Sequence, residues 1–171
     1  LRGGARLACL QAPLLIDNPR ASAISRYFAI EYSSLFDGLL PALAAIDMPL
    51  PLGGTSNHFD AEKLRAAGAW DPYNVTEDAD LGIRLARLGY RTATVRSTTW
   101  EEAPETAGNW YRQRTRWLKG WMQTYLVHMR RPVRLTQQLG LRATIGLQVL
   151  MGGILVAVLA HPLVYVLVAI E

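Results

Sequence analysis

Cysteine, charge and an initial methionine are scarce or missing in this sequence. Of its 171 residues, 19% are charged, half are apolar and one, Cys9, is a cysteine. A lone cysteine excludes an internal disulfide framework and a cysteine-based zinc site, and we expect it to be a small buried hydrophobe. The apolar content excludes a disordered or fibrous chain. The chain starts at Leu1 rather than Met and stops at Glu171 directly after an apolar run, so we expect a fragment of a longer protein. No signal peptide pattern opens it, so nothing indicates secretion.

Acidic side chains are almost absent from the C-terminal part. Residues 1–105 hold 10 Lys/Arg and 13 Asp/Glu, a net charge of −3, whereas residues 106–171 hold 8 basic residues and one acid, a net charge of +7. Such a basic segment favours an anionic partner: phosphate, nucleic acid or lipid headgroups.

Charges are missing altogether from residues 143–160, which form an 18-residue apolar run. A helix of that length is roughly 27 Å long, close to the hydrocarbon thickness of a bilayer. We therefore expect a membrane span rather than a buried core helix. The chain is apolar again after His161-Pro162, which marks either a kink or a turn into a second span, and a proline near a helix end favours the turn. Four arginines precede the run, which by the positive-inside rule predicts that the preceding domain is cytoplasmic: Arg130, Arg131, Arg134 and Arg142.

The residues before this run alternate short apolar stretches with helical patterns, which predicts an α/β domain. Strands are predicted at residues 6–11 and 90–95, and helices at 21–40, 60–67, 78–88 and 106–129. The first helix has one apolar stripe, made of Ile24, Phe28, Tyr32 (or Leu35) and Leu39. Asp60 is expected to cap the second helix and Gly68 to end it. The Gly53-Gly54 pair allows a sharp turn or a close approach to a ligand.

An acidic cluster, Thr76-Glu77-Asp78-Ala79-Asp80, stands where a turn enters a predicted helix. Backbone N–H groups and the helix dipole stabilise carboxylates there, so Thr76 or Asp78 could serve simply as a cap. Asp78 and Asp80 also match the D-x-D pattern of metal–nucleotide sites. Residues two apart on a helix do not face each other, however. A single carboxylate acting as a base is therefore favoured over a metal-binding pair.

A second cluster, residues 110–121, combines aromatic and basic side chains on a helix. Gln113, Arg116 and Trp117 lie within one turn and would present an amide, a guanidinium and an indole to one site. Arginine pairs bidentately with phosphate, and an indole stacks on a sugar or base. The alternatives are an interfacial helix on anionic headgroups, a single-stranded nucleic acid site, or ordinary core and solvated faces. The adjoining apolar run disfavours nucleic acid.

Together these residues resemble a known family. Thr76-Glu77-Asp78, followed after 34 intervening residues by Gln113-Arg114-Thr115-Arg116-Trp117, is similar to the TED and Q-x-x-R-W pair of membrane-embedded family-2 glycosyltransferases, which include cellulose synthases. Gln11, Gly53-Gly54-Thr55 and Glu101-Glu102-Ala103-Pro104 stand in the corresponding order. Gly53 replaces the family's Cys, and Pro51-Leu52 a Phe pair, which argues against cellulose as the product.

The resemblance implies a fold and a set of roles. Residues 1–105 would be the second half of a Rossmann-like GT-A catalytic domain, residues 106–138 an interfacial region, and residues 139–171 one or more transmembrane segments. Asp78 would be the general base. The other implied substrate-binding residues are Thr76, Glu77, Gly54, Thr55, Gln113, Arg114, Arg116 and Trp117, of which Gln113 and Arg116 would hold the donor's pyrophosphate and Trp117 would lie under the acceptor sugar.

The same resemblance implies the partners. A nucleotide-sugar donor, a glycan or lipid acceptor and the lipid bilayer are expected, but no nucleic acid. A divalent metal (Mg or Mn) would be bound by residues outside this chain, so the chain alone would be inactive. The expected location is the bacterial cytoplasmic membrane, with the catalytic part facing the cytoplasm. The alternatives are a non-catalytic membrane-anchored module that binds anionic lipid or nucleic acid through its Arg/Trp helix, and a non-enzymatic subunit of a transport or secretion complex.

Overall fold

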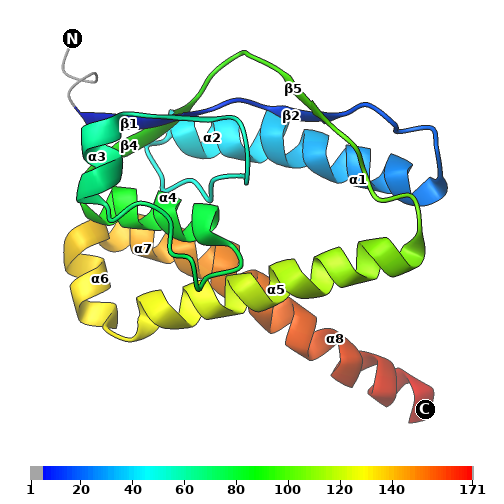
Figure 1. The fold of residues 1–171 in the computed structure, drawn as a ribbon. Coiled ribbons are helices and arrows are strands. Elements are labelled where there is room, and N and C mark those ends of the chain that lie inside the picture. The colour runs from blue at the N-terminus through cyan, green and yellow to red at the C-terminus, as the bar shows by residue number, and fades with distance from the viewer. Residues whose placement is uncertain (1–5, 171) are drawn as a thin grey trace.

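A computed structural model describes residues 6–170 of the protein. Within these residues, five short strands form two sheets on one side of the molecule (Figure 1). The first sheet has the order β3-β1-β4, with β1 antiparallel to β3 and parallel to β4, and the second is the parallel pair β2-β5. The strands are β1 Leu7–Gln11, β2 Leu14–Ile16, β3 Asn57–Phe59, β4 Arg91–Thr94 and β5 Thr99–Glu101. The two predicted strands are confirmed as β1 and β4, and Cys9 in β1 is buried as expected.

The first helical region lies beside the strands and differs from its prediction. It consists of α1 (Ala23–Ser33), the π-helix η2 (Ser34–Leu39) and α2 (Leu40–Ala45). Its buried face is Phe28, Tyr32, Phe36 and Leu40, whereas Leu39 is 38% exposed, so the predicted stripe is wrong at its C-terminal end. A π-helix pairs i with i+5 and has a wider turn. Residues four apart therefore stay on the buried face where an α-helix would have rotated them away.

The helices α3 (Ala61–Ala66) and α4 (Glu77–Arg87) confirm two predictions. The Asp60 side chain caps α3 by accepting from the backbone N–H groups of Glu62 and Lys63, at 3.1 and 3.2 Å. Gly68 ends that turn with a φ of +81°, which glycine adopts without strain. Helix α4 packs Leu81 and Leu85 into the core below the strands.

A long helix, α5 (Ala107–Met129), crosses beneath α4, and the Thr106 side chain caps its start. The chain then turns through α6 (Pro132–Leu139) into a helical segment made of α7 (Leu141–Leu147), η3 (Gln148–Gly152) and α8 (Gly153–Ile170). Within the described residues, this Leu141–Ile170 segment is the helix long and apolar enough to cross a membrane, with a mean hydropathy of 2.5.

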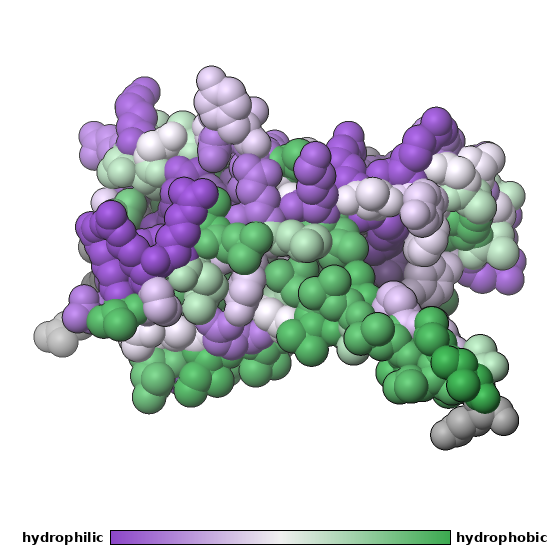
Figure 2. All heavy atoms as spheres, turned by 90° about the horizontal axis from the view of Figure 1, so that it is seen from below, coloured by the Kyte–Doolittle hydropathy of each residue, from purple (hydrophilic) through white to green (hydrophobic). Residues whose placement is uncertain are grey.

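The predicted turn at His161-Pro162 is wrong, because α8 continues through both residues. Proline has no N–H, so one helical hydrogen bond is lost there. A turn would leave several backbone groups unpaired, whereas the continuous helix leaves one carbonyl to satisfy elsewhere. Figure 2 shows α8 as a hydrophobic projection from the body of the protein.

The base of the apolar segment is fixed to the body by a second apolar cluster. Leu147 and Met151 are buried against Ile83 of α4 and Leu135 of α6. Beyond these residues the segment projects, and its most apolar 18-residue window is only 6% buried. The orientation of α8 is therefore coupled to α4, the helix that begins at the acidic cluster.

Candidate functional site

A cavity of about 580 Å³ lies where α1, η2, β5, α4 and α5 meet the loop at residues 51–55. This volume suits a small ligand such as a sugar or nucleotide. Eight of the nine predicted site residues line it: Gly54, Thr55, Thr76, Glu77, Asp78, Gln113, Arg116 and Trp117. The ninth, Arg114, does not.

The buried Gln11 side chain ties the Gly53–Thr55 loop to strand β1. Its amide nitrogen donates to the Thr55 carbonyl at 3.0 Å, and its oxygen accepts from the Gly53 N–H at 2.8 Å. A Cβ atom on Gly54 would lie 3.3 Å from Oδ2 of Asp78. The absence of a side chain at Gly54 thus lets the loop pass close to the Asp78 carboxylate.

Asp78 stands in the first turn of α4 with its side chain partly buried in the cavity wall. Burial raises the pKa of Asp78 to about 6; the backbone N–H of the same residue opposes this shift, and the charge of Glu77 adds to it. Burial therefore outweighs the stabilisation expected at a helix N-terminus. Thr76 is the N-cap residue, but its side chain makes no capping hydrogen bond.

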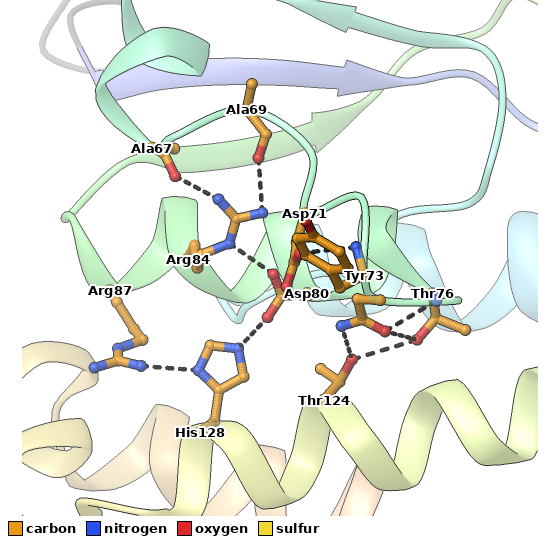
Figure 3. Close-up of polar contacts among 11 residues, drawn as sticks. Ala67, Ala69, Asp71, Tyr73, Thr76, Asp80, Arg84, Arg87, Thr124 and His128 are labelled. Atoms are coloured by element: carbon orange, nitrogen blue, oxygen red, sulfur yellow. Dashed lines mark hydrogen bonds and ion pairs between the residues drawn. The ribbon is translucent and has the colours of Figure 1, made fainter.

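Asp80, two residues on, does not line the cavity. Its side chain belongs to a buried polar cluster (Figure 3). Its carboxylate lies 2.6 Å from Nε of Arg84 and 2.9 Å from Nε2 of His128. Burial alone would raise the pKa of Asp80, but the His128 hydrogen bond and the Arg84 charge together lower it. Asp78 and Asp80 therefore do not share a site. Among residues 6–170, no group of three or more His, Cys, Asp or Glu side chains could hold a metal ion.

His128 extends this cluster from α5 to Arg87 of α4. Its Nδ1 atom lies 2.9 Å from a guanidinium nitrogen of Arg87. A guanidinium only donates hydrogen bonds, so Nδ1 must accept. The proton is then on Nε2, which donates to Asp80. A neutral histidine of defined tautomer thus connects α4 with α5.

The turn before α4 is held against α5 by a second set of contacts (Figure 3). Asn74 donates to the Thr124 hydroxyl at 2.8 Å and accepts from the Thr76 N–H at 3.1 Å. Sequence reasoning missed Asn74, Thr124 and His128. The available signal was the spacing of Gly120, Thr124 and His128, which places three small or polar residues on one face of α5 every fourth position.

Gly120 is the point where α5 approaches this turn most closely. A Cβ atom there would lie 2.5 Å from Cγ2 and 3.0 Å from the backbone nitrogen of Thr76. We therefore expect Gly120→Ala to push α5 from the turn, to destabilise the protein by about 1–3 kcal/mol and to reduce activity. Thermal unfolding and activity of the full-length protein would measure both effects.

Gly108→Ala is the matched control, since Gly108 is also in α5 and no atom beyond its own helical turns lies within 4 Å of its Cβ position. Better helix propensity should leave this variant equally or more stable, by up to about 1 kcal/mol. Equal stability of the Gly120→Ala and Gly108→Ala variants would contradict the role given to the close contact.

Arg114 lies behind the cavity wall. Its guanidinium pairs with Glu31 of α1 and lies over the rings of Phe28, Trp110 and Trp117, at 5.3, 5.6 and 5.2 Å from their centroids. Arg114 thus packs on the Trp117 indole without itself lining the cavity. Eleven further residues line the cavity without a predicted substrate role, among them Tyr32, Glu101 and Trp121.

Comparisons with known proteins identify the family of the chain. The chain is 40% identical over 68 residues to the probable glycosyltransferase YdaM of Bacillus subtilis, covering 39% of this chain and 16% of that protein. It is 28% identical over 108 residues to a poly-beta-1,6-N-acetyl-D-glucosamine synthase of Staphylococcus epidermidis, covering 60% of this chain and 26% of that enzyme. The matches thus cover about a sixth to a quarter of these relatives. The profile of glycosyl transferase family group 2 matches residues 3–170, so the chain belongs to this family.

Proposed function

We propose that this chain is the acceptor-activating part of a membrane-bound, inverting glycosyltransferase. The reaction would move a sugar from a nucleotide-sugar donor to a glycan or lipid-linked acceptor. The observation that carries the proposal is Asp78: a partly buried carboxylate with a pKa of about 6, in a sugar-sized cavity that also contains Arg116 and Trp117. A group with a pKa near the working pH is suited to proton transfer.

Asp78 would take the proton from the acceptor hydroxyl. As that proton moves to the carboxylate, the hydroxyl oxygen forms a bond to the anomeric carbon of the donor sugar. The bond from that carbon to the nucleoside diphosphate breaks on the opposite face, and the leaving group departs with the electron pair. One glycosidic bond forms, one sugar–phosphate bond breaks, and the configuration inverts. Thr76, Glu77, Gly54 and Thr55 would border the acceptor.

Gln113, Arg116 and Trp117 would position the two substrates. They project from one stretch of α5 to the same cavity. The guanidinium of Arg116 can bind two phosphate oxygens at once, and the amide of Gln113 can donate to a third. The indole of Trp117, supported by Arg114, offers a flat apolar surface to a sugar ring. These assignments follow the family resemblance and the shared cavity.

A divalent metal would neutralise charge on the departing diphosphate when bound. The described residues do not fit such an ion, because Asp80 is fully engaged by Arg84 and His128 and no other acidic or histidine cluster accompanies Asp78. We therefore assign the metal to residues outside this chain.

The apolar segment Leu141–Ile170 would anchor the enzyme in the bacterial cytoplasmic membrane, with residues 106–138 at the interface. The length and hydropathy of the helix support this placement. So do the arginines that precede it, which favour a cytoplasmic catalytic part. The polysaccharide synthase among the relatives supports a glycan acceptor over a lipid one.

The test is release of nucleoside diphosphate by membranes that contain the full-length protein. The donors would be UDP-N-acetylglucosamine, UDP-glucose, UDP-galactose and GDP-mannose, each with and without added glycan acceptor. Release from one donor, dependent on Asp78, is the expected result. Absence of release from every donor would favour a non-catalytic anchored module instead.

Replacing Arg116 by Lys should reduce this activity even though the charge is kept. Lysine cannot form the bidentate pair with phosphate, so we expect the KM for the donor to rise about tenfold, the effect of losing one charged hydrogen bond. Arg112→Lys is the matched control, since Arg112 is an exposed arginine of the same helix that contacts Asn109. Equal KM values for the two variants would remove Arg116 from the donor site.

A further inference from the structure

Two hydrogen-bond acceptors in the cavity wall have no partner within the described residues. They are Oε2 of Glu101 and Oε1 of Gln113, both buried, and both residues line the cavity that contains Asp78. Buried polar atoms in native proteins are nearly always hydrogen-bonded, and an unpaired one is costly. Two unpaired acceptors on one cavity wall therefore indicate a ligand that supplies hydrogen-bond donors.

The backbone holds Glu101 firmly at this position. Glu101 pairs with Ile16 in the β2-β5 ladder, and its carbonyl accepts from the Asp17 N–H at 3.1 Å. Its carboxyl lies beside Tyr32, whose pKa is raised by burial and then by the Glu101 charge. Burial also raises the pKa of Glu101, although its contact with Tyr32 opposes the shift. The side chain thus belongs to the cavity wall and not to the outer surface.

The chemistry of the pair selects the ligand group. A phosphate beside Glu101 would be repelled by its carboxylate. The cation proposed to bind phosphate in this cavity is Arg116, whereas Arg114, next to Gln113 in the sequence, is paired with Glu31. Sugar hydroxyls are neutral donors that a carboxylate binds strongly. Gln113 can serve both substrates, because its amide NH₂ can donate to phosphate while its oxygen accepts from a hydroxyl.

On the basis of the proposed glycosyl transfer, we infer that Glu101, together with the oxygen of Gln113, binds a sugar hydroxyl and makes the enzyme selective for sugars that carry it. The hydroxyl belongs either to the transferred sugar or to the terminal sugar of the acceptor. The two sources differ in which substrate must carry the group.

The test compares Glu101→Gln with Glu102→Gln in the full-length protein in membranes. Glu102 is the neighbouring residue and is exposed, so it is the matched control. Loss of the carboxylate should lower kcat/KM about tenfold in the first variant and leave the second unchanged. A change confined to the donor KM would show that the transferred sugar carries the hydroxyl. A change confined to the acceptor KM would show that the acceptor carries it.

Deoxy analogues of the active donor and acceptor then test the contact without relying on the fold of a variant. The wild-type protein should use one analogue about tenfold less well than its parent. On that analogue Glu101→Gln should cause no further loss, because the two changes remove the same hydrogen bond. Equal use of all analogues, or additive losses, would overturn the assignment.

The outcomes also separate this inference from the proposed function. Asp78-dependent release that Glu101→Gln leaves intact would overturn the role of Glu101 alone. No release by the wild-type protein from any donor would overturn both.

Discussion

Asp78→Asn should remove nucleoside diphosphate release almost completely. Asparagine has nearly the same shape but cannot accept the proton of the acceptor hydroxyl, and a general base contributes about 10²- to 10⁴-fold to a rate. We therefore expect kcat to fall about 1,000-fold in full-length protein in membranes, with a donor KM close to that of the wild type. Release that survives the substitution would exclude Asp78 as the base.

The same substitution should stabilise the protein at neutral pH. Because burial raises the pKa of Asp78 from 3.8 to about 6, the ionised side chain opposes folding at pH 7. This difference in pKa corresponds to a gain of at most about 3 kcal/mol in the free energy of unfolding when Asp78 is replaced. This gain of Asp78→Asn should be complete above pH 6, shrink as the pH falls toward 4, and vanish below it. Thermal unfolding of wild type and variant at several pH values would measure it.

Glu62→Gln provides the control for both effects. Glu62 is also an acid in the first turn of a helix, α3, but it is exposed. We expect neither activity nor stability to change in Glu62→Gln.

For Asp78→Asn, a gain in stability together with a loss of activity is the combination expected when a functional group is kept partly buried. A merely structural cap would instead lose stability on substitution.

Sequence patterns predicted the elements that are specified locally. Asp60 caps the start of α3 with its side chain, and Gly68 ends the helix with a left-handed backbone conformation. Both signals are confined to a few residues. Three strands were missed because three residues are too few to show alternation, and their pairing depends on partners far along the chain. The turn at Pro162 was predicted wrongly because proline locally favours the end of a helix, whereas the apolar residues on both sides continue as one helix.

The predicted site residues came together for a different reason. The order of short motifs identified the residues, and the fold brings eight of nine to one cavity. The sequence could not predict the direction in which each side chain points. The sequence does not distinguish the environments of Asp78 and Asp80. In the structure, Asp78 lines the cavity, whereas Asp80 contacts His128, a residue 48 positions away. Arg114 and Arg116 differ in the same way, since Arg114 pairs with Glu31 and only Arg116 lines the cavity.

Asp80→Asn should therefore have the opposite effect from Asp78→Asn. Asp80 accepts from Arg84 and from the Nε2–H of His128, so asparagine would have to place its NH₂ group against one of these donors. Breaking a buried ion pair by removing one partner typically costs about 3–5 kcal/mol. We expect a loss of about 3 kcal/mol at pH 7, measured by thermal or urea unfolding of the full-length protein.

The pH dependence of this loss also has the opposite sign. The His128 hydrogen bond and the Arg84 charge outweigh burial and lower the pKa of Asp80 in the folded protein. Its stabilisation is thus present above the ordinary aspartate pKa of about 4 and disappears in acid. Asp47→Asn is the matched control, because Asp47 pairs with Arg91 at 2.5 Å but its side chain is 53% exposed. Surface pairs contribute at most about 1 kcal/mol, so an Asp80 variant no less stable than the Asp47 variant would show that the α4–α5 contact does not depend on this buried carboxylate.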